Sequence, residues 1–309
     1  MHDSGHADMG EDAYRPTCLP GENALDGSDF APKRVLPDQH QRRQSGMTRT
    51  ARRLLVLGDP DPFTTYECGR PSPFVIVCDH AGGSLPQQLG TLGLSGADLE
   101  RHIAWDIGAG AVASRLGEML DATVIRQNYS RLVIDCNRPL GSPTSIAEIS
   151  ERTTIPGNVG LSSADRDRRA QEIFEPYHHR IEQELNRRLA ASEPTVLIAM
   201  HSFTPCYLSV ERPWHIGLLY RHVAFAHVLI DLLRAEDLVV GDNEPYRVSD
   251  ETDYTLPVHG ERRHLPHVGI EIRQDLVAEE VGQVRWATLL ARLLPMAYQR
   301  LIGDGANAN

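Results

Sequence analysis

The chain has 309 residues, a formal net charge of −11 at pH 7, 41% hydrophobic residues and 24% charged residues. These are values of an ordinary globular protein, so wholesale disorder and a fibrous structure are excluded. Nucleic acid is an unfavourable partner, because its phosphates require a basic face and this sequence concentrates basic residues nowhere. No run approaches the roughly 18 apolar residues of a membrane span. We expect one large α/β domain.

Five cysteines occur, at positions 18, 68, 78, 136 and 206, and none of them forms a Cys-x-x-Cys pair. An odd count with this spacing fits neither a disulfide framework nor a thiolate zinc site. The N-terminus also lacks the apolar segment of a secretory signal. These features predict reduced thiols in a cytoplasmic protein. They leave open whether it is a monomer or a small homo-oligomer.

The N-terminal residues 1–51 are rich in Asp, Gly, Pro, Gln, Arg and His, without a sustained apolar period. We expect them to form a disordered extension, and Met47 is an alternative start of the protein. From "RRLLVLGDP" onward, short apolar runs alternate with amphipathic segments. A single α/β domain is therefore predicted over residues 52–305.

Short, β-branched-rich runs bounded by turn residues predict strands, and apolar repeats of three or four residues predict helices between them. A Ser162-x-x-Asp165 capping signal precedes one of the helices, and Pro176 should kink it. Strands that are apolar on both faces and alternate with helices indicate a mostly parallel sheet covered on both sides, a three-layer α/β/α fold. The expected strands are 74–80, 122–127, 131–136, 195–201, 215–220, 237–242 and 267–273, and the expected helices are 112–120, 170–189 and 284–301.

Polar residues gather where these strands end, which is where open α/β sheets bind ligands. His80 and His201 each follow an apolar run, and Asp106 precedes a helix start. Two histidines and a carboxylate form a common catalytic zinc set, because three ligands leave one tetrahedral position open for water. Glu271, flanked by Ile270 and Ile272, is the candidate general base, since burial raises the pKa of a carboxyl group.

Each of these residues also has a structural alternative. A histidine at a strand end is often a hydrogen-bonded core residue, and Asp106 could simply cap the helix that starts near Gly108. His102 and His267 are the alternatives to Asp106 as the third ligand, with a structural role favoured for His267. A divalent ion other than zinc would also suit these donors.

The segments "CDHAGGSLP", "HIAWDIGAGAVASRL", "YSRLVIDCNRP", "AMHSF", "GDNEPY" and "LPHVGIEIRQDL" occur in this order over residues 74–302. Together they resemble the N-formylglutamate amidohydrolase family, which is similar to zinc carboxypeptidases and aspartoacylase-type deacylases. The resemblance implies a three-layer fold around a mixed eight-stranded sheet. It also implies one zinc ion held by His80, Asp106 and His201, with Glu271 as general base and acid. The His-x-x-Glu motif of carboxypeptidases is not present here, because Gly83 stands three residues after His80.

The same resemblance assigns roles to the segment "RLVIDCNR". Arg131 would polarise the scissile carbonyl, and Asn137 and Arg138 would bind a substrate carboxylate, with Arg273 as a further cation for it. The activity implied is hydrolysis of N-formyl-L-glutamate to formate and glutamate, the last step of one route of histidine degradation. Two alternatives remain: a deacylase for another N-acyl amino acid or peptide-like amide, and a metal-free module that only binds anions.

Overall fold

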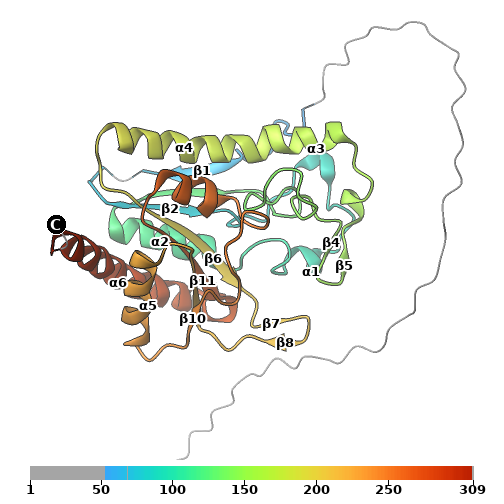
Figure 1. Ribbon diagram of the computed structural model, residues 1–309. Helices are drawn as coiled ribbons and strands as arrows, with labels where there is room; N and C mark the ends of the chain where they lie inside the picture. Colours follow the sequence, from blue (N-terminus) through green and yellow to red (C-terminus); the bar gives the residue numbers. More distant parts are fainter. Residues whose placement is uncertain (1–52, 68, 308–309) are drawn as a thin grey trace, which may run out of the picture.

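The computed structural model describes residues 53–67 and 69–307, and the expected N-terminal extension lies outside the described residues. A seven-stranded sheet forms the centre, in the order β1-β3-β2-β6-β11-β9-β10 (Figure 1). Its strands are β1 (Phe63–Tyr66), β2 (Phe74–Cys78), β3 (Thr123–Gln127), β6 (Val196–Phe203), β9 (Ile216–Leu219), β10 (Val240–Asp242) and β11 (His267–Arg273). Two hairpins lie outside it, β4 (Ile149–Ser150) with β5 (Thr153–Thr154), and β7 (Cys206–Tyr207) with β8 (Val210–Glu211).

The central strands β3, β2, β6 and β11 are parallel to one another. Strand β1 pairs antiparallel with β3 at one edge, and β9 pairs antiparallel with β11 near the other. The predicted mixed, mostly parallel sheet is therefore confirmed, although among the described residues it has seven strands instead of the eight that the family resemblance implied. In the pairing of β6 with β11, His201 lies opposite Glu271.

Helices cover both faces of the sheet, as Figure 1 shows, so the three-layer α/β/α architecture is confirmed. On one face, Ile76, Ile198 and Ile270 pack in one apolar cluster with α2, α5 and α6. On the other face, Val77 and Leu197 pack with Tyr177 and Ile181 of α4. The helices are α1 (Gly96–Leu99), α2 (Ala109–Leu120), α3 (Ser163–Arg169), α4 (Glu175–Ala190), α5 (Val223–Arg234) and α6 (Glu280–Asn307).

The helical segment on the α4 face begins as its sequence predicts. The Ser162 hydroxyl accepts a hydrogen bond from the Asp165 amide at 3.2 Å and caps α3. Between α3 and α4 the chain forms a π-helical turn over Ala170–Phe174, just before Pro176. Proline has no N–H for the helical ladder, so a local change of helix geometry at this position has a direct cause.

The predicted strand over residues 131–136 is wrong, because this segment forms turns although its apolar side chains are buried. Side chains bind its carbonyl groups in place of a neighbouring strand. Arg169 donates to the carbonyl of Val133 at 2.9 Å, Asn158 donates to that of Leu132 at 2.9 Å, and His178 donates to that of Cys136 at 2.8 Å. Buried carbonyls need partners, and three long polar side chains supply them here.

Two further expectations differ from the structure. The edge strand β1 was not predicted, since "FTTY" is short and only half-buried. Of the described cysteines, Cys78 and Cys136 are buried free thiols, whereas Cys206 is not free, so the expectation of reduced thiols does not extend to it.

Gly108 connects the loop that carries Asp106 to helix α2. It adopts a left-handed conformation with φ of 78°, and a Cβ atom there would lie 2.1 Å from the carbonyl oxygen of Val277. Only glycine combines this φ with so close an approach of another backbone. The position of Asp106 therefore depends on a glycine two residues later.

We expect Gly108→Ala to lower the free energy of unfolding by about 3 kcal/mol or more, because the alanine must displace the backbone at Val277. Gly141 is the matched control, since its φ is 85° and its added Cβ would meet no atom within 4 Å. Gly141→Ala should cost only the left-handed strain, about 1 kcal/mol. Urea denaturation of both variants checks this, and equal losses would contradict it.

Candidate metal centre

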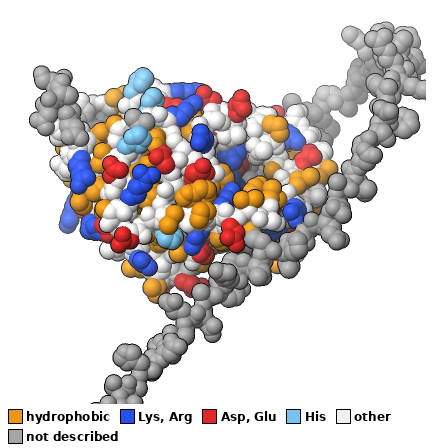
Figure 2. Space-filling model, turned by 60° about the horizontal axis from the view of Figure 1, so that its bottom comes forward, with side chains coloured by type: hydrophobic (Ala, Val, Ile, Leu, Met, Phe, Trp, Pro, Cys, Tyr) orange, Lys and Arg blue, Asp and Glu red, His pale blue; other side chains and the backbone are white. Residues whose placement is uncertain are grey.

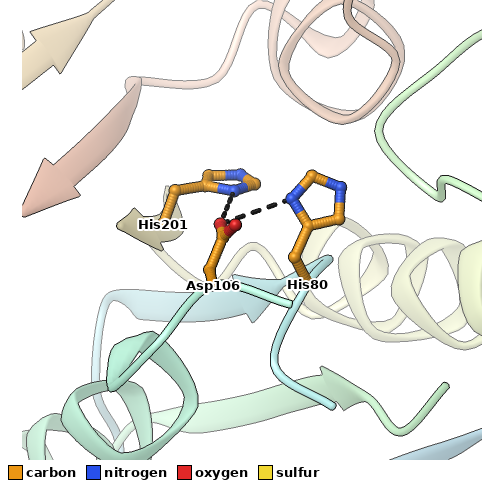
Figure 3. Close-up of side chains that lie close together, drawn as sticks. All are labelled: His80, Asp106 and His201. Carbon is orange, nitrogen blue, oxygen red and sulfur yellow. Dashed lines mark hydrogen bonds and ion pairs between the residues drawn. The ribbon is translucent and has the colours of Figure 1, made fainter. Parts of the chain in front are cut away.

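Three buried side chains meet beyond the ends of the central parallel strands. His80 follows β2, His201 lies near the end of β6, and Asp106 comes from the loop before α2. Figure 3 shows both imidazoles pointing at the same carboxylate. The Asp106 Oδ2 atom lies 3.3 Å from Nδ1 of His80 and 2.9 Å from Nδ1 of His201.

One ligand atom from each of these residues lies within 4.8 Å of the other two, so the group could hold a metal ion. Gly108 caps α2, and Asp106 contributes only its backbone carbonyl to the amide of Ala109. The alternative in which Asp106 caps this helix is therefore wrong, and its side chain is free to face the two histidines.

A second carboxylate lies behind each histidine. The Nε2 atom of His80 is 2.7 Å from Asp135 Oδ1, and the Nε2 atom of His201 is 3.3 Å from Asp79 Oδ2. Asp79 also accepts hydrogen bonds from the hydroxyls of Tyr177 and Thr255, both at 2.8 Å. Carboxylates that hold the outer nitrogen of a histidine fix the ring and direct its other nitrogen at a metal.

The charges of this cluster suit a divalent cation. Burial alone would lower the pKa values of His80 and His201, but the surrounding carboxylates outweigh it and raise both of them. The carboxylates that stabilise positive charge on the two imidazoles would also attract a divalent cation, so the donor set fits such an ion.

Glu271 faces the same region from β11, the strand next to β6. Its side chain is buried, and its Oε2 atom has no hydrogen-bond partner among the described residues. Burial raises the pKa of Glu271 to about 7. The positive charge of His201 lowers this pKa, and the negative charge of Asp106 raises it. A carboxyl group with this pKa can both take and return a proton near neutral pH.

These residues line one cavity of about 440 Å³, which opens between the loops beyond the sheet. Arg131 also lines it and joins two of the acidic residues: it donates to Asp135 at 2.8 Å and to Asp106 at 3.3 Å. A quarter of its side chain remains exposed in the cavity. Arg131 thus balances the carboxylates while it keeps further N–H groups available.

Asn137 and Arg138 also line the cavity, but their contacts differ. The amide oxygen of Asn137 accepts from the backbone amides of Tyr254 and Thr255, and its nitrogen donates to Asp253, so this side chain ties a loop in place. Arg138 donates to backbone carbonyls only, and no carboxylate among the described residues forms an ion pair with it.

The structure does not bring Arg273 to the site predicted for it, because its side chain pairs with Asp275 and does not line the cavity. His102 lines the cavity but pairs with Glu151 at 3.2 Å, and His267 donates from Nδ1 to the carbonyl of Leu265 at 2.7 Å. Neither histidine belongs to the cluster of three, so the geometry favours Asp106 as the third ligand atom.

Several residues at the site were missed by the sequence analysis. Asp135 could have been found, because it stands within the apolar run 132–136, and a carboxyl group among apolar residues had already marked Glu271 as a functional candidate. Asp79 had only its position beside His80 as a signal. Tyr246 ends the segment "GDNEPY" and Arg247 follows it; both line the cavity, although the sequence analysis gave neither residue a role.

Comparison with known proteins places this geometry in a family. The profile of the N-formylglutamate amidohydrolase family matches residues 72–278, a span that includes the three clustered residues and Glu271. A gene product of Agrobacterium tumefaciens with a known structure is 36% identical, with coverage of 81% of this chain and 99% of its own, and a TM-score of 0.78. An N-formylglutamate amidohydrolase from Ralstonia eutropha shares the fold at 19% identity, with coverage of 78% and 98% and a TM-score of 0.61. No curated protein matches the sequence significantly.

The family match extends over more than half of the chain and includes the polar residues at the strand ends. It therefore agrees with the resemblance that the sequence motifs indicated, and it supports an enzyme over a module that only binds anions. The chain belongs to the N-formylglutamate amidohydrolase family and is a hydrolytic enzyme that acts on amides.

Proposed function

We propose that the protein hydrolyses N-formyl-L-glutamate to formate and glutamate, with one zinc ion held by His80, Asp106 and His201. The observation that carries the proposal is the convergence of these three donors beside Glu271, whose buried Oε2 atom has no partner among the described residues. The set has two imidazoles and one carboxylate, and this composition suits zinc better than the hard cations that prefer oxygen ligands.

The proposed reaction divides its tasks between the ion and the chain. When bound, the ion acts as a Lewis acid that lowers the pKa of a water molecule and polarises the scissile carbonyl. Glu271 accepts the proton of that water and later donates it to the leaving amine, a use that its pKa of about 7 supports. Asp79 and Asp135 keep the two histidines oriented throughout the reaction.

Arginine side chains line the cavity, which supports the proposal of an acidic substrate. We propose that Arg131 donates to the scissile carbonyl and that Arg138 binds a substrate carboxylate, with Asn137 holding the loop at residues 253–255 against this site. Arg247 takes the place first expected for Arg273, because it lines the cavity and forms no ion pair with any described residue. Two arginines without carboxylate partners suit a substrate with two carboxylates.

The volume of the cavity favours one second candidate. About 440 Å³ lies within the range of roughly 300–1,000 Å³ that accommodates drug-sized ligands, and N-formylglutamate is small by comparison. A deacylase for an N-acyl amino acid with a bulkier acyl group would use the same residues. The rate of release of glutamate from N-formyl-, N-acetyl- and N-succinyl-L-glutamate distinguishes these substrates directly.

We further propose that the enzyme acts in the cytoplasm, as a monomer or a small homo-oligomer, on small anionic substrates without nucleic acid. On the face seen in Figure 2, basic, acidic and hydrophobic side chains are interspersed, without a continuous basic surface. Within the described chain, no helix is both long and apolar enough to cross a membrane. Light scattering of the purified protein decides its oligomeric state.

Asp106→Asn should lower the affinity for zinc by more than about 100-fold, because the amide keeps the shape of the side chain but loses its charge. His102→Gln is the matched control, since His102 lines the same cavity without belonging to the cluster. Competition with a chromophoric chelator measures both affinities. An Asp106→Asn protein that binds zinc as the wild type does would contradict the proposed ligand set.

Glu271→Gln should retain one zinc ion per chain and lower kcat for N-formyl-L-glutamate by about 100-fold or more, because glutamine cannot accept a proton. Formate release gives the rate, and elemental analysis gives the zinc content of the same sample. Unchanged turnover would remove Glu271 as the general base. A wild-type protein that contains zinc but hydrolyses only bulkier N-acyl amino acids would favour the second candidate.

Arg247→Gln should raise KM for N-formyl-L-glutamate about 10-fold or more with little change in kcat, since a hydrogen bond between charged groups contributes about 1.5–3 kcal/mol. Arg273→Gln is the control, because Arg273 pairs with Asp275 away from the cavity. Steady-state kinetics of the two variants measure the difference. Equal values of KM would exclude Arg247 from the carboxylate site.

A further inference from the structure

Tyr246 is a cavity residue to which neither the sequence motifs nor the proposed reaction assigned a role. It lies in the loop after β10 and lines the same cavity as Glu271 and Arg131. Its side chain is neither fully buried nor free in solvent, with 42% of the residue exposed. A phenol in this position can touch a bound substrate.

The residue that follows the hairpin β7–β8 contacts this tyrosine. Arg212, which directly follows β8, is 8% exposed, and its guanidinium carbon lies 4.8 Å from the ring centroids of both Tyr207 and Tyr246. It donates from Nη1 to the hydroxyl oxygen of Tyr246 at 2.9 Å. No carboxylate in the described part of the chain forms an ion pair with Arg212, so its hydrogen bond with Tyr246 is not displaced by an acidic side chain.

The hydrogen bond from Arg212 determines what Tyr246 can offer a ligand. A phenol has one O–H donor and accepts through its oxygen, and here the oxygen accepts from Arg212. The O–H group donates to no described residue, and the side chain faces the cavity, so a ligand there can accept this proton. Burial and the negative charge of Glu271 raise the pKa of Tyr246, and the hydroxyl therefore keeps its proton at neutral pH.

We propose that Tyr246 is a catalytic residue that donates a hydrogen bond to the oxygen of the scissile carbonyl as negative charge develops on it. The inference rests on the proposed function. Tyr246 lines the same cavity as Glu271 and Arg131, the two residues assigned to the scissile bond, and its O–H group has no acceptor among the described residues. Arg212 is then a positioning residue, because it acts through Tyr246.

The matched control is Tyr66, which has the same partner chemistry outside the cavity. The guanidinium carbon of Arg126 lies 4.9 Å from the Tyr66 ring centroid, and Arg126 donates to the Tyr66 hydroxyl at 2.9 Å. Tyr66 is 44% exposed, close to the value of Tyr246, but it lies in the edge strand β1. Removal of its hydroxyl disturbs an equivalent arginine contact without touching a substrate.

The experiment compares wild type, Tyr246→Phe and Tyr66→Phe, all loaded with zinc, in steady-state hydrolysis of N-formyl-L-glutamate. Tyr246→Phe should lower kcat about 100-fold with KM changed less than about threefold, because the lost donor acts on the transition state. Tyr66→Phe should keep the wild-type kcat. Zinc content and binding of glutamate, measured by calorimetry, should be the same in all three proteins, since Tyr246 is neither a ligand nor part of the carboxylate site.

The possible outcomes separate this inference from the proposed function. A wild-type protein that hydrolyses none of the N-acyl glutamates would overturn both. An active wild type together with a Tyr246→Phe variant of equal kcat would overturn the role of Tyr246 alone. A rise in KM without a fall in kcat would also overturn it, because Tyr246 would then only bind the ground state. An equal loss of kcat in Tyr66→Phe would also overturn it, because the effect would then come from a general disturbance of the structure.

Discussion

Burial of charge beyond the ends of the parallel strands is the constraint on which the rest of this structure depends. Asp79, Asp106 and Asp135 are all less than 5% exposed, and their carboxylates face His80, His201 and Arg131. Removal of one partner from a buried ion pair is strongly destabilising, because the remaining charge stays buried without compensation. The cluster is therefore stable only as a whole, and each of its members fixes the position of the next.

The sheet determines where this cluster forms. Strands β2, β6 and β11 are neighbours and parallel, so the residues at their carboxyl ends meet at one edge. The apolar residues before these ends, such as Val77, Ala199 and Ile270, are fully buried and keep the strands in register. The apolar core thus fixes the positions of the ionisable side chains. It also supplies the stability that the charges themselves do not.

The buried turn segment 131–136 is the second device that shapes the site. Its apolar side chains occupy the core beneath α4, while Arg131 and Asp135 reach the cavity. Because Arg169, Asn158 and His178 bind its carbonyls, the segment keeps an irregular path that a strand could not follow. A regular strand would hold residues 131 and 135 about 13 Å apart, too far to pair. In this turn Arg131 donates to Asp135 at 2.8 Å, and Asp135 lies 2.7 Å from His80.

The sequence by itself determined the mixed sheet, its helical layers and the residues that meet at its end, because apolar periodicity and strand-end polar residues are local signals. It also singled out Glu271 through its apolar neighbours. Only the tertiary structure decided that residues 131–136 form no strand, that Arg273 pairs with Asp275 and does not line the cavity, and that Tyr246 and Arg247 line it. The path of residues 131–136 and the position of Tyr246 depend on partners more than 30 residues distant, such as Arg169 for Val133 and Arg212 for Tyr246. A local pattern carries no information about which distant side chain will bind a carbonyl or a hydroxyl.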